Sequence, residues 1–386
     1  MLIRADKNKF IKIFNPETGF YARTSELKAD AFTDQKKAQE MSEQLAFYTM
    51  ETAEKMLGTG HDPFMADYPE LLDIGIMGTC KHAQTGLCAK SGVQCYQGGA
   101  GKKYPNMPLR DFVNIMDQIS GRTFQVALGG RGDVNKHEEF EGILRCCRSY
   151  GVIPNYTTSG LDLTDEEAAL TAELCGAVAV SWYDRSPEGY TYAAINKFIE
   201  HGVKTNIHFV LGNNSIDEAI ERLANNDFPE GINAVVFLLH KPVGLGQAKN
   251  VLDINDPKVA QFFQLVEDGE HNFKIGFDSC TMCGILNKTT KINLDTADTC
   301  EGARYSAYIT SDSLMLPCSF DNQDLFYAVD LKEHTIEEAW YSEPFETFRN
   351  KMRFSCSGCA KKELCKGGCP LQRSIVLCDA PEKDLR

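Results

Sequence analysis

The chain of 386 residues lacks any apolar run near the roughly 18–20 residues that span a bilayer. Its first ten residues, MLIRADKNKF, lack the apolar core of a signal peptide. An excess of basic charge is also missing, because 54 Asp and Glu outnumber 40 Lys and Arg, for a formal net charge of −14. Proteins that bind nucleic acid duplexes usually present a basic face. We therefore expect a cytoplasmic protein without a membrane partner, and the charge disfavours a nucleic acid partner.

We also expect no structural disulfides, although the chain has 15 cysteines. A reducing compartment disfavours disulfides, which leaves metal ligands, catalytic thiols or small buried apolar side chains. Cys146, Cys147 and Cys175 fall within helix-like segments, and we expect them in the core. The other cysteines gather in one loop near residues 80–95 and in the region beyond residue 280.

Apolar strand-like segments alternate with helical patterns from Leu71 onward. Helical spacing separates the strands, and the helix that opens at Thr164 begins with a capping box, Thr-Asp-Glu-Glu. Apolar strands that alternate with helices indicate a parallel sheet covered by helices. We expect strands at 71–77, 123–128, 151–160, 177–183, 204–212 and 233–240, and a short seventh at 273–279. These six β/α units predict an α/β fold built on an open, partial (β/α)6 barrel.

Two further regions flank the predicted barrel. Residues 1–70 read as a short α+β preface, with a hairpin around Asn15-Pro16-Glu17-Thr18-Gly19 and a helix at about 34–56. Residues 280–386 are rich in cysteine and poor in long apolar runs. The predicted domains are therefore 1–70, 71–279 and 280–386.

Three cysteines, Cys80, Cys88 and Cys95, stand in a loop that follows the first predicted strand. Chemistry in such folds takes place at the carboxyl ends of the strands, where this loop lies. Three thiolates can hold three irons of a [4Fe–4S] cluster and leave the fourth iron open to a substrate or cosubstrate. A zinc site completed by His82 is the alternative, although the gaps of seven and six residues exceed the usual zinc spacing.

A second array of cysteines closes the sequence. CSGCAKKELCKGGCP carries the spacing C-x2-C-x5-C-x3-C, typical of a metal site. Two zinc sites with four cysteines each are the alternative to iron–sulfur clusters. The array comprises Cys280, Cys283, Cys300, Cys318, Cys356, Cys359, Cys365, Cys369 and Cys378.

These features together resemble the radical S-adenosylmethionine (SAM) enzymes with a C-terminal SPASM domain, over about residues 70–380. In that family a CxxxCxxC-aromatic loop after the first strand holds the SAM-binding cluster, and Cys95-Tyr96 fits its end, although the spacing here is expanded. The resemblance implies that Tyr96 borders the cofactor and that the backbone of Gly129 and Gly130 binds the SAM amino group. Arg131 stands where an acidic residue often follows the glycine pair. Contacts to the SAM carboxylate or ribose are implied for three residues that fit equally well as polar core residues: Ser181, Asn206 and His208.

The same resemblance implies two auxiliary [4Fe–4S] clusters in the C-terminal domain, for three in all. Cys280 is preferred over Cys283 as the fourth ligand of the first, because it directly follows the last predicted barrel strand. Ser313 stands where the family usually has glycine. The first cluster would take Cys300, Cys318, Cys369 and Cys280, and the second Cys356, Cys359, Cys365 and Cys378.

The implied activity is reductive cleavage of SAM to a 5′-deoxyadenosyl radical that abstracts hydrogen from a peptide. Such enzymes mature ribosomally made peptides by forming thioether, carbon–carbon or related crosslinks, with electrons from a flavodoxin or ferredoxin. A leader peptide could add to a strand edge in residues 1–70. Ser319 replaces the Asp that sulfatase-maturing relatives carry, which leaves Asp321 as the candidate catalytic residue. The alternatives are a radical SAM enzyme for a small molecule or RNA, and a non-enzymatic zinc or iron–sulfur protein.

Overall fold

The computed structural model describes most of the chain in its central part and shorter stretches at both ends. The predicted helix at about 34–56 and Cys356 lie outside the described residues. Described are residues 2–5, 10–17, 19, 21–25, 65–98, 104–292, 299–351, 359, 361, 365–372, 374, 375, 377 and 378.

A small antiparallel sheet forms the start of the chain, with β1 (Leu2–Ala5), β2 (Phe10–Phe14) and β3 (Tyr21–Ser25) in that order. Phe14 is buried against Phe124 and Ile153, with 5.7 Å between the two phenylalanine ring centroids. Because Phe124 and Ile153 lie at the amino ends of two barrel strands, this sheet covers the end of the barrel opposite the predicted site.

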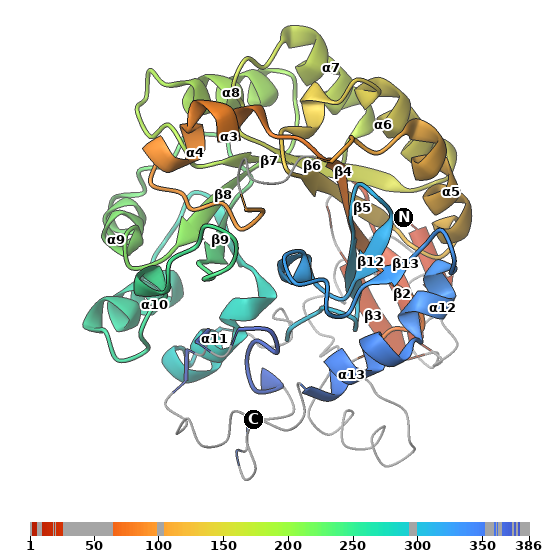
Figure 1. Ribbon diagram of the computed structural model, residues 1–386. Coiled ribbons are helices and arrows are strands. Elements are labelled where there is room, and N and C mark those ends of the chain that lie inside the picture. The colour runs from red at the N-terminus through yellow and green to blue at the C-terminus, as the bar shows by residue number, and fades with distance from the viewer. Residues whose placement is uncertain are drawn as a thin grey trace.

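Seven parallel strands form the barrel wall, and each of the first six is followed by a helix, as predicted. In Figure 1 the helices make an outer ring around the curved sheet. The strands are β4 (Leu71–Met77), β5 (Gln125–Gly130), β6 (Ile153–Thr158), β7 (Ala177–Ser181), β8 (Thr205–Leu211), β9 (Ala234–Leu239) and β10 (Lys274–Phe277). The helices are α5 (Leu109–Ile119), α6 (Phe140–Ser149), α7 (Asp165–Leu174), α8 (Tyr190–Glu200), α9 (Ile216–Asn225) and α10 (Pro257–Asp268).

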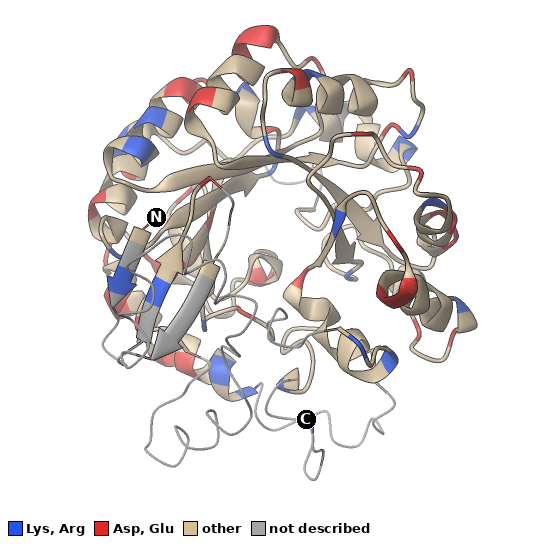
Figure 2. Ribbon diagram, turned by 180° about the vertical axis from the view of Figure 1, so that it is seen from behind, with Lys and Arg blue, Asp and Glu red and all other residues tan. Residues whose placement is uncertain are grey.

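The capping box predicted at Thr164 is present, because its side chain accepts from the Glu167 N–H and Glu167 bonds back to the Thr164 N–H. Acidic and basic residues are intermixed on the outer helices in Figure 2, whereas the strands of the inner wall carry few charges. Within the described residues, no helix combines the length and apolarity that crossing a bilayer requires.

The two faces of the barrel sheet differ in polarity. On β4, Leu72, Ile74 and Ile76 are fully buried and alternate with Asp73 and Gly75 on the other face. The outer face packs against helices, whereas the inner face carries polar residues such as Asp73 and His208 beside apolar ones such as Leu238. The expectation of apolar strands therefore does not hold at Asp73 and His208, which face a cavity inside the barrel.

The cysteine-rich region does not form a separate layer. Its strand β11 (Ser306–Ile309) pairs in parallel with β4 and extends the barrel sheet to ten strands, with Tyr308 opposite Asp73. The pairing joins regions that the sequence assigned to different domains. The remaining elements are 3-10 helices η5 (Ser279–Thr281) and η7 (Ser319–Asp321), helices α11 (Met282–Lys288), α12 (Ile336–Trp340) and α13 (Glu343–Lys351), and strands β12 (Leu314–Leu316) and β13 (Val329–Asp330).

Substitutions of Ser313 can test whether the turn between β11 and β12 requires a left-handed backbone conformation. It is buried and has φ +70°, a left-handed conformation that glycine adopts without strain. A β-branched residue is a conformational outlier there, so Ser313→Val should lower the free energy of unfolding by about 1–2 kcal/mol. Ser313→Gly should change it by less than about 0.5 kcal/mol. Thermal midpoints of both variants check this, and equal midpoints would contradict a backbone constraint.

Candidate functional site

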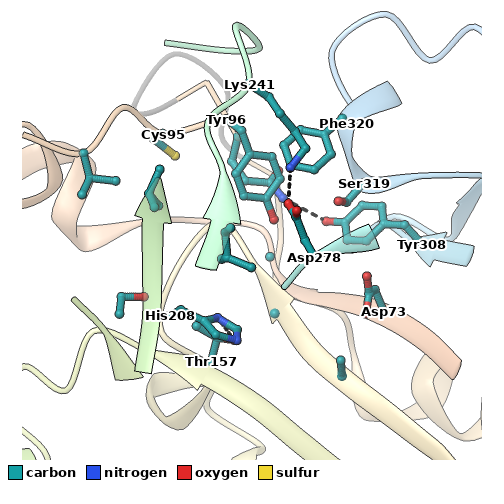
Figure 3. Close-up of a pocket in the computed structure, with 18 of the residues that line it drawn as sticks. Asp73, Cys95, Tyr96, Thr157, His208, Lys241, Asp278, Tyr308, Ser319 and Phe320 are labelled. Atoms are coloured by element: carbon teal, nitrogen blue, oxygen red, sulfur yellow. Dashed lines mark hydrogen bonds and ion pairs between the residues drawn. The ribbon is translucent and has the colours of Figure 1, made fainter. Parts of the chain in front are cut away.

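A cavity of about 440 Å³ opens at the carboxyl ends of the barrel strands. Its walls come from the cysteine loop, from the ends of strands β4 to β9 and from the C-terminal domain. Figure 3 shows side chains from these three sources around one space. Six cysteines line it: Cys80, Cys88 and Cys95 from the loop, and Cys280, Cys300 and Cys318 from the C-terminal domain.

The expanded cysteine loop contains two short helices, α3 (Lys81–Thr85) and α4 (Leu87–Lys90), where the sequence shows no clear helical period. Gly86 joins them with φ +69°, in the left-handed region. The Cys80 sulfur caps α3 by accepting from the Ala83 N–H at 3.3 Å. The extra residues thus fold into helical turns, and Cys88 stands on the second of them.

The three loop thiols lie close enough to affect one another electrostatically. The pKa of Cys88 is raised to about 11 by burial, with smaller contributions from Cys95 and Cys80, although a hydrogen bond with Tyr183 opposes the rise. Burial also raises the pKa of Cys80, to which Cys95 adds. Thiolates so placed need positive charge to be stable, which iron supplies. The donor set therefore fits a cluster held by three cysteines.

His82 was the fourth ligand in the alternative zinc site, and in the structure its side chain contacts Asp133 and Ser159. Its Nε2 lies 2.6 Å from Asp133 Oδ2 and 3.1 Å from Ser159 Oγ, and Ser159 Oγ donates to Asp133 Oδ2 at 2.7 Å. Burial opposes the ionised form of Asp133, but the His82 and Ser159 hydrogen bonds hold its pKa below the usual range. This network fastens α3 to the loop after β5.

Two backbone contacts hold the end of the cysteine loop. The Leu245 N–H donates to the Cys95 carbonyl at 2.9 Å. Gly244 has φ +64°, and a Cβ there would overlap the Tyr96 carbonyl. Arg131 donates from Nη1 to the Gln97 carbonyl at 2.5 Å. The arginine that replaces the family's acidic residue therefore anchors the loop.

Gly129 and Gly130 line the cavity but serve different purposes. Gly130 has φ +117°, and a Cβ there would lie 2.5 Å from the Met77 carbonyl, so glycine is required for packing against β4. A Cβ on Gly129 would meet no atom of the described residues within 4 Å. Space next to Gly129 is thus available for a ligand.

Ser181 and His208, predicted to contact the cofactor, both line the cavity. Burial lowers the pKa of His208 to about 4, so its ring is neutral at neutral pH. Asn206 is not in the cavity wall, because it lies near the start of β8 and accepts from Asn233 Nδ2 at 2.7 Å. The structure therefore does not bring Asn206 together with the other residues predicted to contact SAM.

The first C-terminal thiol group unites Cys280, Cys300, Cys318 and Cys369. Burial raises the pKa of Cys300 to about 12, and Cys369 adds to the rise. The pKa of Cys280 and that of Cys318 are raised by burial and then by Cys300 and Cys369. The structure thus gathers the four thiols proposed for one auxiliary cluster, with Cys280 among them.

Cys283 belongs to a second group. Its Sγ lies 3.1 Å from that of Cys365, and Cys378 acts on it electrostatically more strongly than Cys280 does. Among the described residues, no three His, Cys, Asp or Glu side chains converge as ligands of one ion would. A cubane places each thiolate on a different iron, so its ligands surround a volume instead.

Asp321 has a structural role. Its carboxylate accepts from the backbone N–H of Tyr327 at 2.9 Å and of Phe326 at 3.3 Å. The side chain is buried and does not line the cavity. The structure therefore places Asp321, the candidate catalytic residue, outside the cavity wall.

A buried ion pair that the sequence analysis missed links the segments that follow the neighbouring strands β9 and β10. Lys241 Nζ lies 2.5 Å from Asp278 Oδ2 and 4.4 Å from the centre of the Phe320 ring, which packs on Tyr96 at 4.7 Å. Burial opposes the charge, but Asp278 and Cys280 keep the pKa of Lys241 above its usual value. The sequence signal for this lysine was its position directly after His240, the last residue of the sixth predicted strand.

The sequence analysis also missed Asp73, which reaches from β4 into the cavity (Figure 3). Burial raises the pKa of Asp73 to about 6. An acidic residue within an otherwise apolar strand was the signal that could have found it.

Comparison with known proteins relates the C-terminal domain to a protein family and the fold to solved structures. Residues 300–360 match the model of the SPASM family, an iron–sulfur cluster-binding domain. No curated protein matches the sequence significantly. The predicted C-terminal SPASM domain is confirmed by the match over residues 300–360.

The fold matches that of SuiB from Streptococcus suis bound to S-adenosylmethionine, with a TM-score of 0.67, 16% identity, and 98% of this chain and 97% of that chain covered. SuiB bound to its precursor peptide SuiA gives a TM-score of 0.67 at 16% identity, covering 95% and 94%. anSMEcpe with bound AdoMet gives 0.57 at 17% identity, covering 80% and 87%. The predicted fold class is therefore confirmed.

Gly129 and Gly130 provide a paired test. Gly129→Val should leave the thermal midpoint nearly unchanged and weaken SAM binding at least about tenfold, because the side chain fills the space beside the backbone. Gly130→Val should destabilise the protein by about 3 kcal/mol or more through backbone strain and overlap with Met77. Calorimetry and thermal unfolding separate the two effects. Unchanged SAM affinity in Gly129→Val would refute the role of that glycine.

Cys280 and Cys283 should affect different clusters, because they belong to different thiol groups. We expect Cys280→Ala and Cys283→Ala each to alter a different paramagnetic resonance signal of the reduced protein. The double variant Cys146→Ala/Cys175→Ala, which alters cysteines of the outer helical layer, should keep all signals. The assignment fails if both single variants alter the same signal.

Proposed function

We propose that this protein is a radical SAM enzyme that cleaves SAM reductively and abstracts a hydrogen atom from a peptide. The peptide would be ribosomally made, and the product would carry a crosslink such as a thioether or a carbon–carbon bond. One observation carries the proposal: three thiols of the strand-end loop and three of the C-terminal domain face the same cavity. A substrate in that cavity lies between two cluster sites.

Three [4Fe–4S] clusters are part of the proposal. Cys80, Cys88 and Cys95 would hold the first and leave one iron to SAM. When bound there, cluster and SAM supply the electron and the 5′-deoxyadenosyl radical that the reaction needs. The auxiliary clusters would be held by Cys280, Cys300, Cys318 and Cys369, and by a set drawn from Cys283, Cys356, Cys359, Cys365 and Cys378.

The barrel residues would bind and orient SAM. The backbone beside Gly129 is open to a ligand, and Tyr96 and Ser181 lie in the same wall. The neutral ring of His208 offers one hydrogen-bond donor and one acceptor without adding charge to the cavity.

The first C-terminal thiol group gives the proposal its oxidative character. Cys280, Cys300 and Cys318 face the space where a substrate radical would form. A cluster held there would accept the electron that the product radical releases as the new bond forms. Lys241, paired with Asp278, supplies a buried cation next to Cys280.

A peptide substrate is supported by the relatives of known structure. SuiB was crystallised with its precursor peptide SuiA, and anSMEcpe with a peptide, Kp18Cys. A leader peptide could add to an edge of the small sheet, whose outer strands are β1 and β3. Flavodoxin or ferredoxin would supply electrons, and the cytoplasm is the predicted location.

SAM cleavage tests the proposal directly. Anaerobically reconstituted protein with dithionite should convert SAM to 5′-deoxyadenosine. The triple variant Cys80→Ala/Cys88→Ala/Cys95→Ala should lose this activity together with about four irons, because it removes every ligand of one cluster. Cys146→Ala/Cys175→Ala should keep both. Product analysis by chromatography and iron determination check the result.

Retained cleavage in the triple variant would disprove the assignment of the loop. Zinc in place of iron and sulfide in the purified protein would favour the non-enzymatic alternative.

A further inference from the structure

Asp73 lies deeper in the cavity than the residues proposed to hold SAM. It stands on the inner face of β4, opposite Ala127 of β5 and Tyr308 of β11. Gly129 is two residues further along β5 than Ala127, or about 6.6 Å toward the carboxyl end. Figure 3 shows the Asp73 carboxylate directed into the cavity near Tyr308 and Ser319. Asp73 therefore borders the barrel floor, beneath the cofactor region.

Four acidic residues line the cavity, and the structure provides three of them with hydrogen bonds. Asp133 bonds to His82 and Ser159, Asp278 bonds to Lys241, and Glu301 accepts from Ser279 at 3.5 Å. For Asp73, no hydrogen bond or ion pair occurs with any described residue. Asp73 is partly buried and lines the cavity, and burial raises its pKa, so a cationic partner inside the cavity would stabilise its ionised form.

The basic residues of the cavity wall are already engaged. Lys241 pairs with Asp278, Arg131 donates to the Gln97 carbonyl, and Arg185 pairs with Glu218 at 2.5 Å. An ionised carboxylate only accepts hydrogen bonds, and its strongest partners are ammonium and guanidinium groups. A ligand that brings such a group would satisfy Asp73.

We propose that Asp73 binds the cationic side chain of a lysine or arginine in the substrate peptide and so positions that residue for hydrogen abstraction. The inference rests on the proposed function in taking a peptide as the ligand. It adds that the cavity selects a basic side chain. Asp73 acts here as a positioning residue.

The test uses blocked pentapeptides, acetyl-Ala-Ala-X-Ala-Ala-amide, with lysine, arginine, norleucine or glutamate at X. Binding to the cluster-loaded, SAM-saturated protein is measured by calorimetry without reductant. The wild type should bind the lysine and arginine peptides at least about tenfold more tightly than the norleucine peptide. Asp73→Asn should abolish this preference and leave the iron content, the SAM affinity and the thermal midpoint at or above wild-type values.

Charge reversal gives a result that a structural role would not produce. Asp73→Lys should bind the glutamate peptide more tightly than the lysine peptide. Glu166→Gln, which removes an exposed carboxylate from α7, should behave as the wild type. If Asp73→Lys does not fold, the comparison of Asp73→Asn with the wild type decides alone.

Three results would overturn the proposal: a wild type indifferent to the cation, a preference that persists in Asp73→Asn, or a tenfold loss of SAM affinity in that variant. The last would assign Asp73 to the cofactor. Because the assay needs no SAM cleavage, failure of cleavage in the wild type would count against the proposed function alone.

Discussion

The barrel is held together from one side of its sheet. Fully buried residues such as Leu72, Ile74 and Phe237 face the helices, and Phe237 meets Phe262 of α10 with 5.0 Å between ring centroids. The opposite face carries Asp73 and His208, which cannot form an apolar core. The apolar burial that stabilises the fold must therefore come from the outer layer. The interior remains free for ligands because it is not needed for that purpose.

Because apolar packing does not fill the barrel interior, the cavity residues must be held in place by other contacts. Polar contacts between the cysteine loop and the C-terminal domain hold them. Gln97 donates to the Tyr308 hydroxyl at 3.4 Å and accepts from Asn322 at 2.7 Å. Gly75 lacks a Cβ that would overlap that hydroxyl. The residue two positions after Cys95 thus touches the domain that carries the other thiols. The two halves of the cavity are positioned relative to each other by these bonds.

The sequence predicted the barrel well, because alternating apolar strands and amphipathic helices depend on local spacing. Two features of the site depended on contacts far apart in the chain and could not be read from spacing: the pairing of β11 with β4, and the contact of Cys283 with Cys365. Asn206 was misplaced because a strand was treated as one position, although its first and last residues lie at opposite ends of the barrel. Asp73 was missed because the strand was interpreted as apolar throughout. An assignment of alternate residues of this strand to its two faces would have placed Asp73 on the inner face.

The pairing of β11 with β4 also bears on how the molecule is made. β4 is the first strand of the barrel, whereas β11 begins only at Ser306. β4 therefore pairs with its second neighbour, β11, only after most of the chain has left the ribosome. Contacts so distant in sequence slow folding. Until then β4 presents an unpaired edge, with backbone groups that any extended chain could pair with. Protection of that edge in the nascent protein is thus a requirement of this architecture.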